Sequence, residues 1–180
     1  KHEQRLPFVD AIAHANLRCT LVLVHKPTLK EPERFQERYR LYFYAVRMLL
    51  ERVSWFCRDH RTSHDAGDGG AELIFSNRSG MAYEDLREYL HRLKSHTSDF
   101  EVRIDWSVIV PERVMALTSG KRMGLQIADA VASSCFYAVQ PSQHGFTEDR
   151  YVRMLKSVVY HREGKHVGYG LKFWPREVDV

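Results

Sequence analysis

The sequence predicts an α/β protein in which apolar strand segments alternate with amphipathic helices. Three observations predict this class: a β-branched apolar run at residues 17–25, a long helical stripe from residue 33 to about 59, and later strand segments separated by helices. Such alternation is typical of an α/β layer with at least partly parallel strands. Residues 1–180 show no repeat or second domain, and we expect them to form a single domain with its own core.

The first third of the chain contains the longest predicted helix. A short helix at residues 8–15 leads into the strand at 17–25, which Lys26-Pro27 closes. Pro32 stands where a helix often begins. The helix predicted from residue 33 to about 59 has apolar residues at spacings of three and four, which form one face. These residues are Phe35, Tyr39, Tyr42, Phe43, Val46, Leu49, Leu50, Val53 and Phe56.

The middle of the chain predicts a loop, a strand and a second helix. Gly and Asp residues interrupt the pattern at residues 61–70, and residues 72–76 then form a short apolar strand. Residues 77–80 predict a turn. The following helix, at residues 82–94, has Tyr83, Leu86, Leu90 and Leu93 on one face.

The last third predicts one more strand and two helices. Residues 101–110 alternate well enough for a strand, and we expect Pro111 to end it. A loop at 112–123 precedes a helix that runs to about residue 139, before Pro141. Thr147-Glu148-Asp149 is a plausible cap for a helix at 147–161. The Gly-rich, aromatic tail from residue 164 onward yields no assignment.

Composition excludes several classes of protein. No apolar run approaches the roughly 18 residues that span a bilayer, and the first residues lack the apolar stretch of a secretory signal. We therefore expect a cytoplasmic protein with no membrane partner.

Cys19, Cys57 and Cys135 lie in apolar contexts, which suits buried, reduced thiols; no Cys-x-x-Cys pair supports the alternative, a three-cysteine zinc site. The net charge of +4 permits an acidic polymer as partner without requiring one.

Asp129 is the most informative residue of the chain. It stands among small and apolar residues of the segment 124–134, although aspartate is a poor residue for a helix interior. A carboxylate on such a face needs a partner, and a metal ion or a nearby base would serve. Gln126 and Ser133 lie three and four residues away on the same side. The alternative is that Asp129 pairs with an arginine or caps a neighbouring loop.

The segment Ser119-Gly120-Lys121-Arg122-Met123, followed by Gly124-Leu125-Gln126-Ile127-Ala128-Asp129, resembles the C-terminal signature of one family. That family is domain of unknown function 3800, whose members resemble nucleases of the ribonuclease H-like superfamily found with mobile elements and phage defence. The resemblance implies a central mixed sheet flanked by helices. It also implies that this chain is the C-terminal two-thirds of the domain, with N-terminal strands and their Asp-Glu-Ser motif upstream of Lys1.

The resemblance further implies a site for two divalent metal ions, Mg²⁺ or Mn²⁺, held between carboxylates. Asp129 is the implied catalytic metal ligand, and Gln126 and Ser119 are the implied supporting residues. The long helix would contribute a second acidic ligand, for which Glu51 or Glu37 is the candidate.

One position departs from the family pattern. A carboxylate is expected near Ser76-Asn77, and this chain has none there. Glu72 and Asp105, on predicted strands, are possible substitutes, although exposed acids on strands are usually only solvated. A composition-based metal cluster at His60, His64, Asp65 and Asp68 is more simply explained as a polar loop.

Basic residues near the expected site are candidates for phosphate contacts. Arg78 follows the predicted strand at 72–76, and Lys121 and Arg122 precede the Asp129 helix. No phosphate-binding loop of an NTPase and no Gly-x-Ser-x-Gly nucleophile elbow occurs.

Two functions stay open: a metal-dependent nuclease, or a catalytically degenerate module that binds nucleic acid or a partner protein in a larger assembly, with homo-oligomers also possible.

Overall fold

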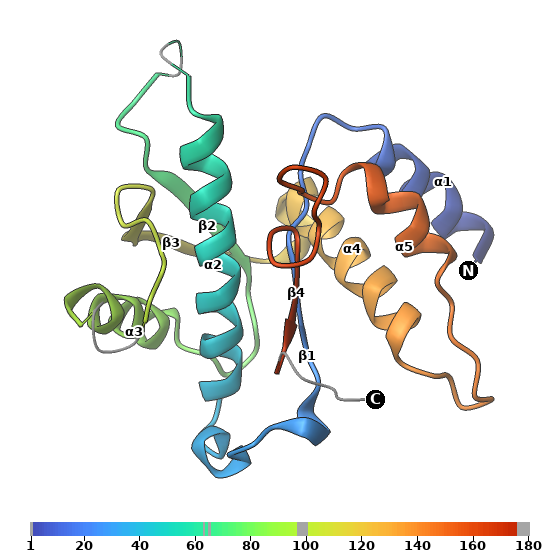
Figure 1. Ribbon diagram of the computed structural model, residues 1–180, viewed down its shortest axis with the longest axis horizontal. Coiled ribbons are helices and arrows are strands. Elements are labelled where there is room, and N and C mark those ends of the chain that lie inside the picture. The colour runs from blue at the N-terminus through green and yellow to red at the C-terminus, as the bar shows by residue number, and fades with distance from the viewer. Residues whose placement is uncertain (1, 63, 65, 97–100, 176–180) are drawn as a thin grey trace.

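The computed structural model describes residues 2–62, 64, 66–96 and 101–175 (Figure 1). Its helices are α1 (His2–Ala13), α2 (Arg40–His60), α3 (Tyr83–Ser95), α4 (Met123–Val139) and α5 (Arg150–Met154). Its strands are β1 (Leu21–Val24), β2 (Ala71–Ser76), β3 (Ile109–Leu117) and β4 (Leu171–Trp174). Short 3₁₀ turns lie at Lys26–Thr28, Pro32–Phe35, Ser119–Lys121 and Leu155–Ser157.

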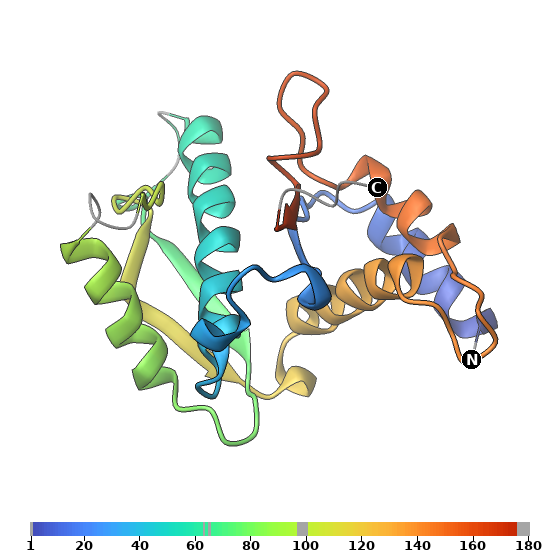
Figure 2. The ribbon, with the colours of Figure 1, turned by 60° about the horizontal axis from the view of Figure 1, so that its bottom comes forward.

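The strands form two separate parallel pairs, with α2 between them. β2 pairs with β3, and β1 pairs with β4. Figures 1 and 2 show α2 with β2, β3 and α3 on one side and with β1 and β4 on the other. The predicted α/β class with parallel strands is therefore confirmed. The single central mixed sheet is not formed by the described residues, which build two small parallel sheets instead.

The larger core joins α2 and α3 to β2 and β3. Leu86 and Leu90 of α3 are fully buried there, together with Ile109 of β3 and Leu50 of α2. The predicted apolar face of α3 is the face that the structure buries. The helix also has acidic residues in its first turn and basic residues in its last turn, which complements the helix dipole.

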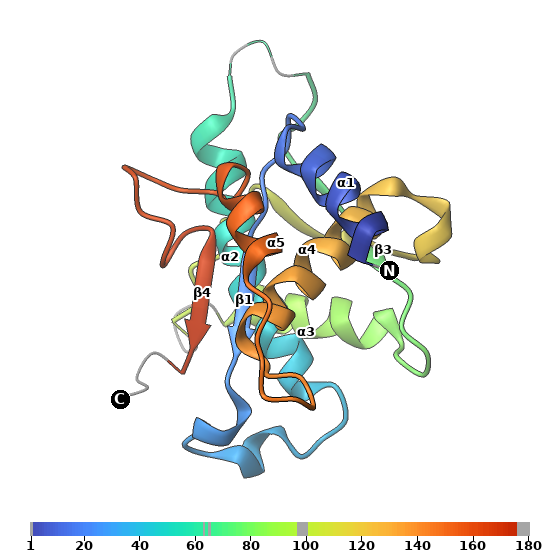
Figure 3. The same cartoon turned by 90° about the vertical axis from the view of Figure 1, so that its right-hand side faces the viewer.

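A second, smaller core lies between α1, α4 and α5, which Figure 3 shows packed together. Val9 and Ile12 of α1 lie in one cluster with Val131 of α4. Its other buried members are Cys19, Tyr151, Leu155 and Val158. The predicted helix at 8–15 is present but begins earlier, at His2. Because this core buries only one side of α4, the other side is left to face a cavity.

The long predicted helix begins seven residues later than expected. Pro32–Phe35 forms a separate 3₁₀ turn, and α2 starts at Arg40. Tyr39 has a φ of 66°, in the left-handed region that an α-helix of L-residues does not tolerate. The apolar residues thus keep helical spacing from residue 35 onward, although the helix itself starts only at Arg40. The spacing alone does not show that the backbone leaves the helical conformation at Tyr39.

The prediction of a strand at residues 101–110 is wrong. Most of the observed strand lies instead within residues 112–123, where a loop is predicted. β3 begins at Ile109 and includes Pro111, which lies where the β2–β3 register shifts between Ala71 and Leu73. A proline is tolerated at such an irregularity because no ladder hydrogen bond is required of it.

The segment before β3 is fixed by α2 instead of by a sheet. The backbone N–H of Arg103 donates to Glu51 Oε1 at 3.3 Å, and that of Asp105 donates to Ser54 Oγ at 3.0 Å. The indole of Trp55 donates to the carbonyl oxygen of Arg103 at 2.7 Å. Val102, Ile104 and Val108 are buried without forming a strand. Polar side chains of a helix have thus replaced the hydrogen-bond ladder that the alternation predicted.

The C-terminal part is less helical than expected. The helix predicted at 147–161 is limited to Arg150–Met154 and the 3₁₀ turn that follows. The unassigned tail forms β4, which aligns Leu171 to Trp174 with Leu21 to Val24. β1 is accordingly shorter than the predicted strand at 17–25.

Two further expectations concern membrane spans and thiols. None of the helices in the described part of the chain is long and apolar enough to cross a membrane. Cys19 and Cys135 are buried and Cys57 is half-buried, all three as free thiols, and burial raises the pKa of each. The burial expected of the cysteines is confirmed for two of them.

Two tyrosines of the larger core predict a loss of stability in alkali. Burial raises the pKa of Tyr42 and of Tyr89 to about 12, whereas both titrate near about 10 in an unfolded chain. The unfolded state therefore loses protons first, and the free energy of unfolding should fall as the pH rises from about 10 to about 12. Urea titrations at several pH values in this range measure how the free energy of unfolding changes with pH, and tyrosinate absorbance follows the ionisation of the tyrosines. A Tyr42→Phe, Tyr89→Phe double variant that keeps the full slope would contradict this assignment.

Candidate functional site

A cavity of about 850 Å³ lies between α1, α2, β2 and α4. Three residues predicted for the site, Ser119, Gln126 and Asp129, all contribute to its lining. Glu72 and Ser76 of β2 line it as well. The structure thus brings one end of the Asp129 helix to the strand that follows the long helix.

The buried side of α4 determines what the helix presents to the cavity. Val131 packs in the core shared with α1 and α5, and Ser134 Oγ donates to the carbonyl oxygen of Ala130 at 2.7 Å. Asp129 and Gln126 are exposed, and Ser133 lines the cavity with them, as their spacing predicts. Within the described residues, the side chain of Asp129 forms neither an ion pair nor a hydrogen bond. The alternative in which it pairs with an arginine is therefore not observed there.

β2 contributes a second carboxylate and a hydroxyl. Glu72 and Ser76 lie four residues apart, so they project from the same face of the strand. Ser76 occupies the position where the family resemblance implies a carboxylate, and it does line the cavity. Asn77 does not line it, and its backbone N–H continues the pairing with β3 by donating to the carbonyl oxygen of Leu117 at 2.7 Å. Glu72 is thus the acidic residue that β2 supplies.

Glu51 is not brought to Asp129. It lies on another face of α2, where its side chain is buried between two arginines. Its Oε1 is 3.7 Å from Arg47 Nε, its Oε2 is 3.5 Å from Arg52 Nη1, and Oε1 also accepts the backbone N–H of Arg103. This carboxylate fixes arginines and lines a different cavity, so we do not retain it as a metal ligand beside Asp129.

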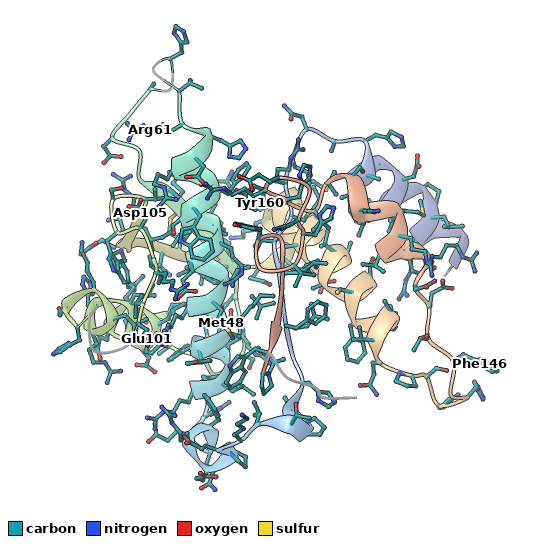
Figure 4. All side chains as sticks on the ribbon, viewed as in Figure 1. Met48, Arg61, Glu101, Asp105, Phe146 and Tyr160 are labelled. Carbon is teal, nitrogen blue, oxygen red and sulfur yellow. The ribbon has the colours of Figure 1, made fainter. Side chains whose placement is uncertain are left out.

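Glu37 and Asp105 also lie outside the described lining of the cavity. Glu37 precedes α2 and forms an exposed ion pair with Arg40 at 3.2 Å. Asp105 accepts hydrogen bonds from Ser107, which hold the pKa of its carboxyl below the usual value, and it lies 3.6 Å from Arg58. Figure 4 shows Asp105 and α4 on different sides of α2.

The three predicted phosphate contacts are not among the described lining residues of the cavity. Lys121 and Arg122 are exposed and directly precede α4, next to Ser119. Arg78 is exposed beyond the end of β2, with its guanidinium 5.2 Å from the ring centroid of Tyr42. None of these three residues belongs to the described lining of the cavity.

Among the described residues, the cation that lines the cavity is Arg5, which the sequence patterns did not indicate. It lies on α1 with its guanidinium 5.0 Å from the ring centroid of Tyr137, another lining residue. The two residues are separated by 132 positions in the chain. No local pattern predicts such a contact, since it depends on α1 packing against α4.

The polar residues of the described lining supply oxygen atoms as possible metal ligands. Carboxylates come from Glu72 and Asp129, hydroxyls from serines and an amide oxygen from Gln126. This set suits a Mg²⁺ ion that retains several waters. Among the described residues, no group of three or more His, Cys, Asp or Glu side chains is placed to hold a metal. The donor chemistry is of the kind that Mg²⁺ accepts, and the described lining supplies two carboxylates, fewer than the several that the two-metal arrangement of the resemblance implies.

The histidine-containing loop gives no metal site in the described part of the chain. Asp68 instead forms two hydrogen bonds with Arg113, which hold the pKa of its carboxyl well below its usual range. His60 Nδ1 lies 2.9 Å from the carbonyl oxygen of Phe56. Asp65 lies outside the described residues. The interpretation of this segment as a polar loop agrees with these contacts.

Comparisons of the chain with family models, with curated proteins and with solved structures yield no match. The functional argument consequently depends on the cavity and on the motif that lines it.

Proposed function

We propose that this chain carries a divalent-metal-dependent nuclease site of the ribonuclease H-like kind, which hydrolyses phosphodiester bonds of nucleic acid. One observation carries the proposal. Ser119, Gln126 and Asp129, which the family resemblance names from sequence, line the same cavity as the carboxylate of Glu72. Asp129 is exposed to that cavity and forms no ion pair with another described residue.

Each residue has a distinct role in this proposal. Asp129 and Glu72 hold Mg²⁺ or Mn²⁺, which when bound supplies a Lewis acid and an activated water. The Gln126 amide and the Ser119 hydroxyl orient the scissile phosphate by hydrogen bonds. Arg5 offsets the charge of that phosphate inside the cavity, and Lys121 and Arg122 contact the polymer backbone outside it.

The second candidate function is a degenerate ribonuclease H-like module that binds nucleic acid or a partner protein without cleaving it. Ser76 favours this candidate, because a hydroxyl adds no negative charge where the family pattern has a carboxylate. The absence of a three-acid group among the described residues favours it as well. The two candidates differ in whether Asp129 is required for chemistry.

Cleavage of single- and double-stranded DNA and RNA tests the nuclease. We expect cutting that requires Mg²⁺ or Mn²⁺, stops with EDTA, and falls by about a hundredfold or more in Asp129→Asn, because that change removes a ligand charge and keeps the shape. Asp85→Asn, on the exposed first turn of α3, is the matched control. Cutting that survives Asp129→Asn would place the site elsewhere, and binding without any cutting would support the degenerate module.

A further inference from the structure

A second cavity, of about 590 Å³, opens on another face of α2. Among the described residues, it shares no lining residue with the cavity of Asp129. Its walls come from α2, from the segment after α3 and from the chain around β4. Figure 4 labels Met48 on α2 and Glu101 after α3, both of which belong to this lining. Its volume lies in the range of small-ligand sites, which is about 300–1,000 Å³.

Buried charges make this cavity different from an ordinary surface hollow. Arg47, Glu51 and Arg52 have side-chain exposures of only 13%, 10% and 5%. The carboxylate forms ion pairs with both guanidinium groups, and Arg52 Nη1 also donates to the carbonyl oxygen of Met48 at 2.5 Å. Arg47 Nη2 also donates to the carbonyl oxygen of Glu101 at 3.4 Å, which ties the helix to the opposite wall. Two preorganised guanidinium groups at a cavity wall are suited to a phosphate.

Further cations increase the positive charge of the described lining. Arg103 and Lys172 add two cations to those of α2, and Glu101 adds one carboxylate to that of Glu51. The described lining therefore contains four cationic and two anionic side chains. Field lines concentrate in a concave, low-dielectric site, so an anion is the favoured ligand.

Aromatic side chains alternate with these cations. Tyr44 and Trp174 line the cavity with ring centroids 4.8 Å apart, and the Arg47 guanidinium lies 5.4 Å from the Tyr44 centroid. Trp55 has Arg52 at 5.4 Å from its ring, and its indole N–H is held by the carbonyl oxygen of Arg103. Aromatic faces stack nucleobases, and neighbouring arginines hold the phosphates between them.

We infer that this second cavity binds a nucleotide unit of single-stranded nucleic acid, with the base against the aromatic side chains and the phosphate beside the cations. The site is separate from the proposed catalytic cavity and rests on the proposed function only for the class of polymer. Because stacking and phosphate contacts do not read base edges, the site tolerates different sequences. It would hold a strand while another part of it enters the cavity of Asp129.

Binding of a fluorescein-labelled dT₁₂ and rU₁₂, measured by anisotropy in EDTA, tests this inference independently of cleavage. The double variant Arg103→Gln, Lys172→Gln removes two lining cations. Arg18→Gln, Lys156→Gln removes two exposed cations outside both cavities and is the charge-matched control. We expect the first variant to bind about tenfold more weakly, with a salt slope that is shallower by about 0.7 for each phosphate no longer neutralised. The control should bind like the parent protein.

Trp174→Leu tests the stacking contribution separately, since it leaves every cation in place. We expect about tenfold weaker binding because one base is no longer stacked. Unfolding midpoints for all variants establish that each is folded. Equal weakening by the two double variants would overturn the site in favour of charge attraction over the whole surface. Unchanged binding by Trp174→Leu, or equally tight binding of labelled polyglutamate, would overturn the assignment to nucleic acid.

Discussion

Glu51→Ala is expected to lower the free energy of unfolding by about 3–5 kcal/mol, because it breaks a buried ion network by removing the shared partner. Arg47 and Arg52 would remain buried on α2 without the carboxylate that lies 3.7 and 3.5 Å from them. The backbone N–H of Arg103 would lose its acceptor as well. The segment that precedes β3 should loosen with the helix. Urea unfolding followed by circular dichroism measures the change.

Glu37→Ala is the matched control for this prediction. Its ion pair with Arg40 is solvent-exposed, and such pairs contribute about 0–1 kcal/mol. Glu51→Gln should recover part of the loss, since an amide oxygen still accepts the N–H of Arg103. A loss below about 1 kcal/mol in Glu51→Ala would show that solvent already screens the two arginines, contrary to their burial.

Gly170→Ala is expected to destabilise the protein by about 2–3 kcal/mol, because an added Cβ cannot be accommodated. That atom would lie 2.0 Å from the carbonyl oxygen of Tyr160 and 2.8 Å from its carbonyl carbon. These are backbone atoms of a segment whose N–H donates to Cys19. Gly170 itself accepts the N–H of Leu21, at the start of the β1–β4 pairing. Thermal unfolding would report the loss.

Gly120→Ala provides the comparison, since nothing lies within 4 Å of its Cβ position and its backbone needs no left-handed conformation. It should change stability by less than about 0.5 kcal/mol. Equal effects of the two substitutions would contradict the close approach of residues 160 and 170, and with it the arrangement of β4 beside β1.

Short-range sequence patterns predict the elements that depend mainly on residues close together in the chain. The α3 face formed by Leu86 and Leu90 follows from spacing, and the structure buries it. α4 ends at Val139, as the Pro141 that follows it predicts. β3 was misplaced because Pro111 normally ends a strand, and only the register shift against β2 makes it tolerable within one. β4 was missed because its partner is β1, about 150 residues earlier in the chain.

The residues of the candidate site divide in the same way. Those that share one helix are predictable from sequence, and those that meet through packing between elements are not. Gln126 and Asp129 belong to one helix, so their common face follows from sequence alone. Glu51 is a candidate ligand by its position in the long helix, yet helical periodicity alone does not say which face of α2 meets α4. Arg5 lines the cavity because α1 packs against α4, and no short-range sequence pattern predicts that packing.

Binding of Mn²⁺, followed by electron paramagnetic resonance, tests the central claim most directly, because it asks only whether the cavity holds a divalent ion. We predict one weak site, abolished in Asp129→Asn, weakened by about tenfold or more in Glu72→Gln, and tightened in Ser76→Asp, which adds a carboxylate at the position where the resemblance implies one. Asp85→Asn should leave binding unchanged. Mn²⁺ affinity that is the same in the parent protein and in all three cavity variants would contradict the account.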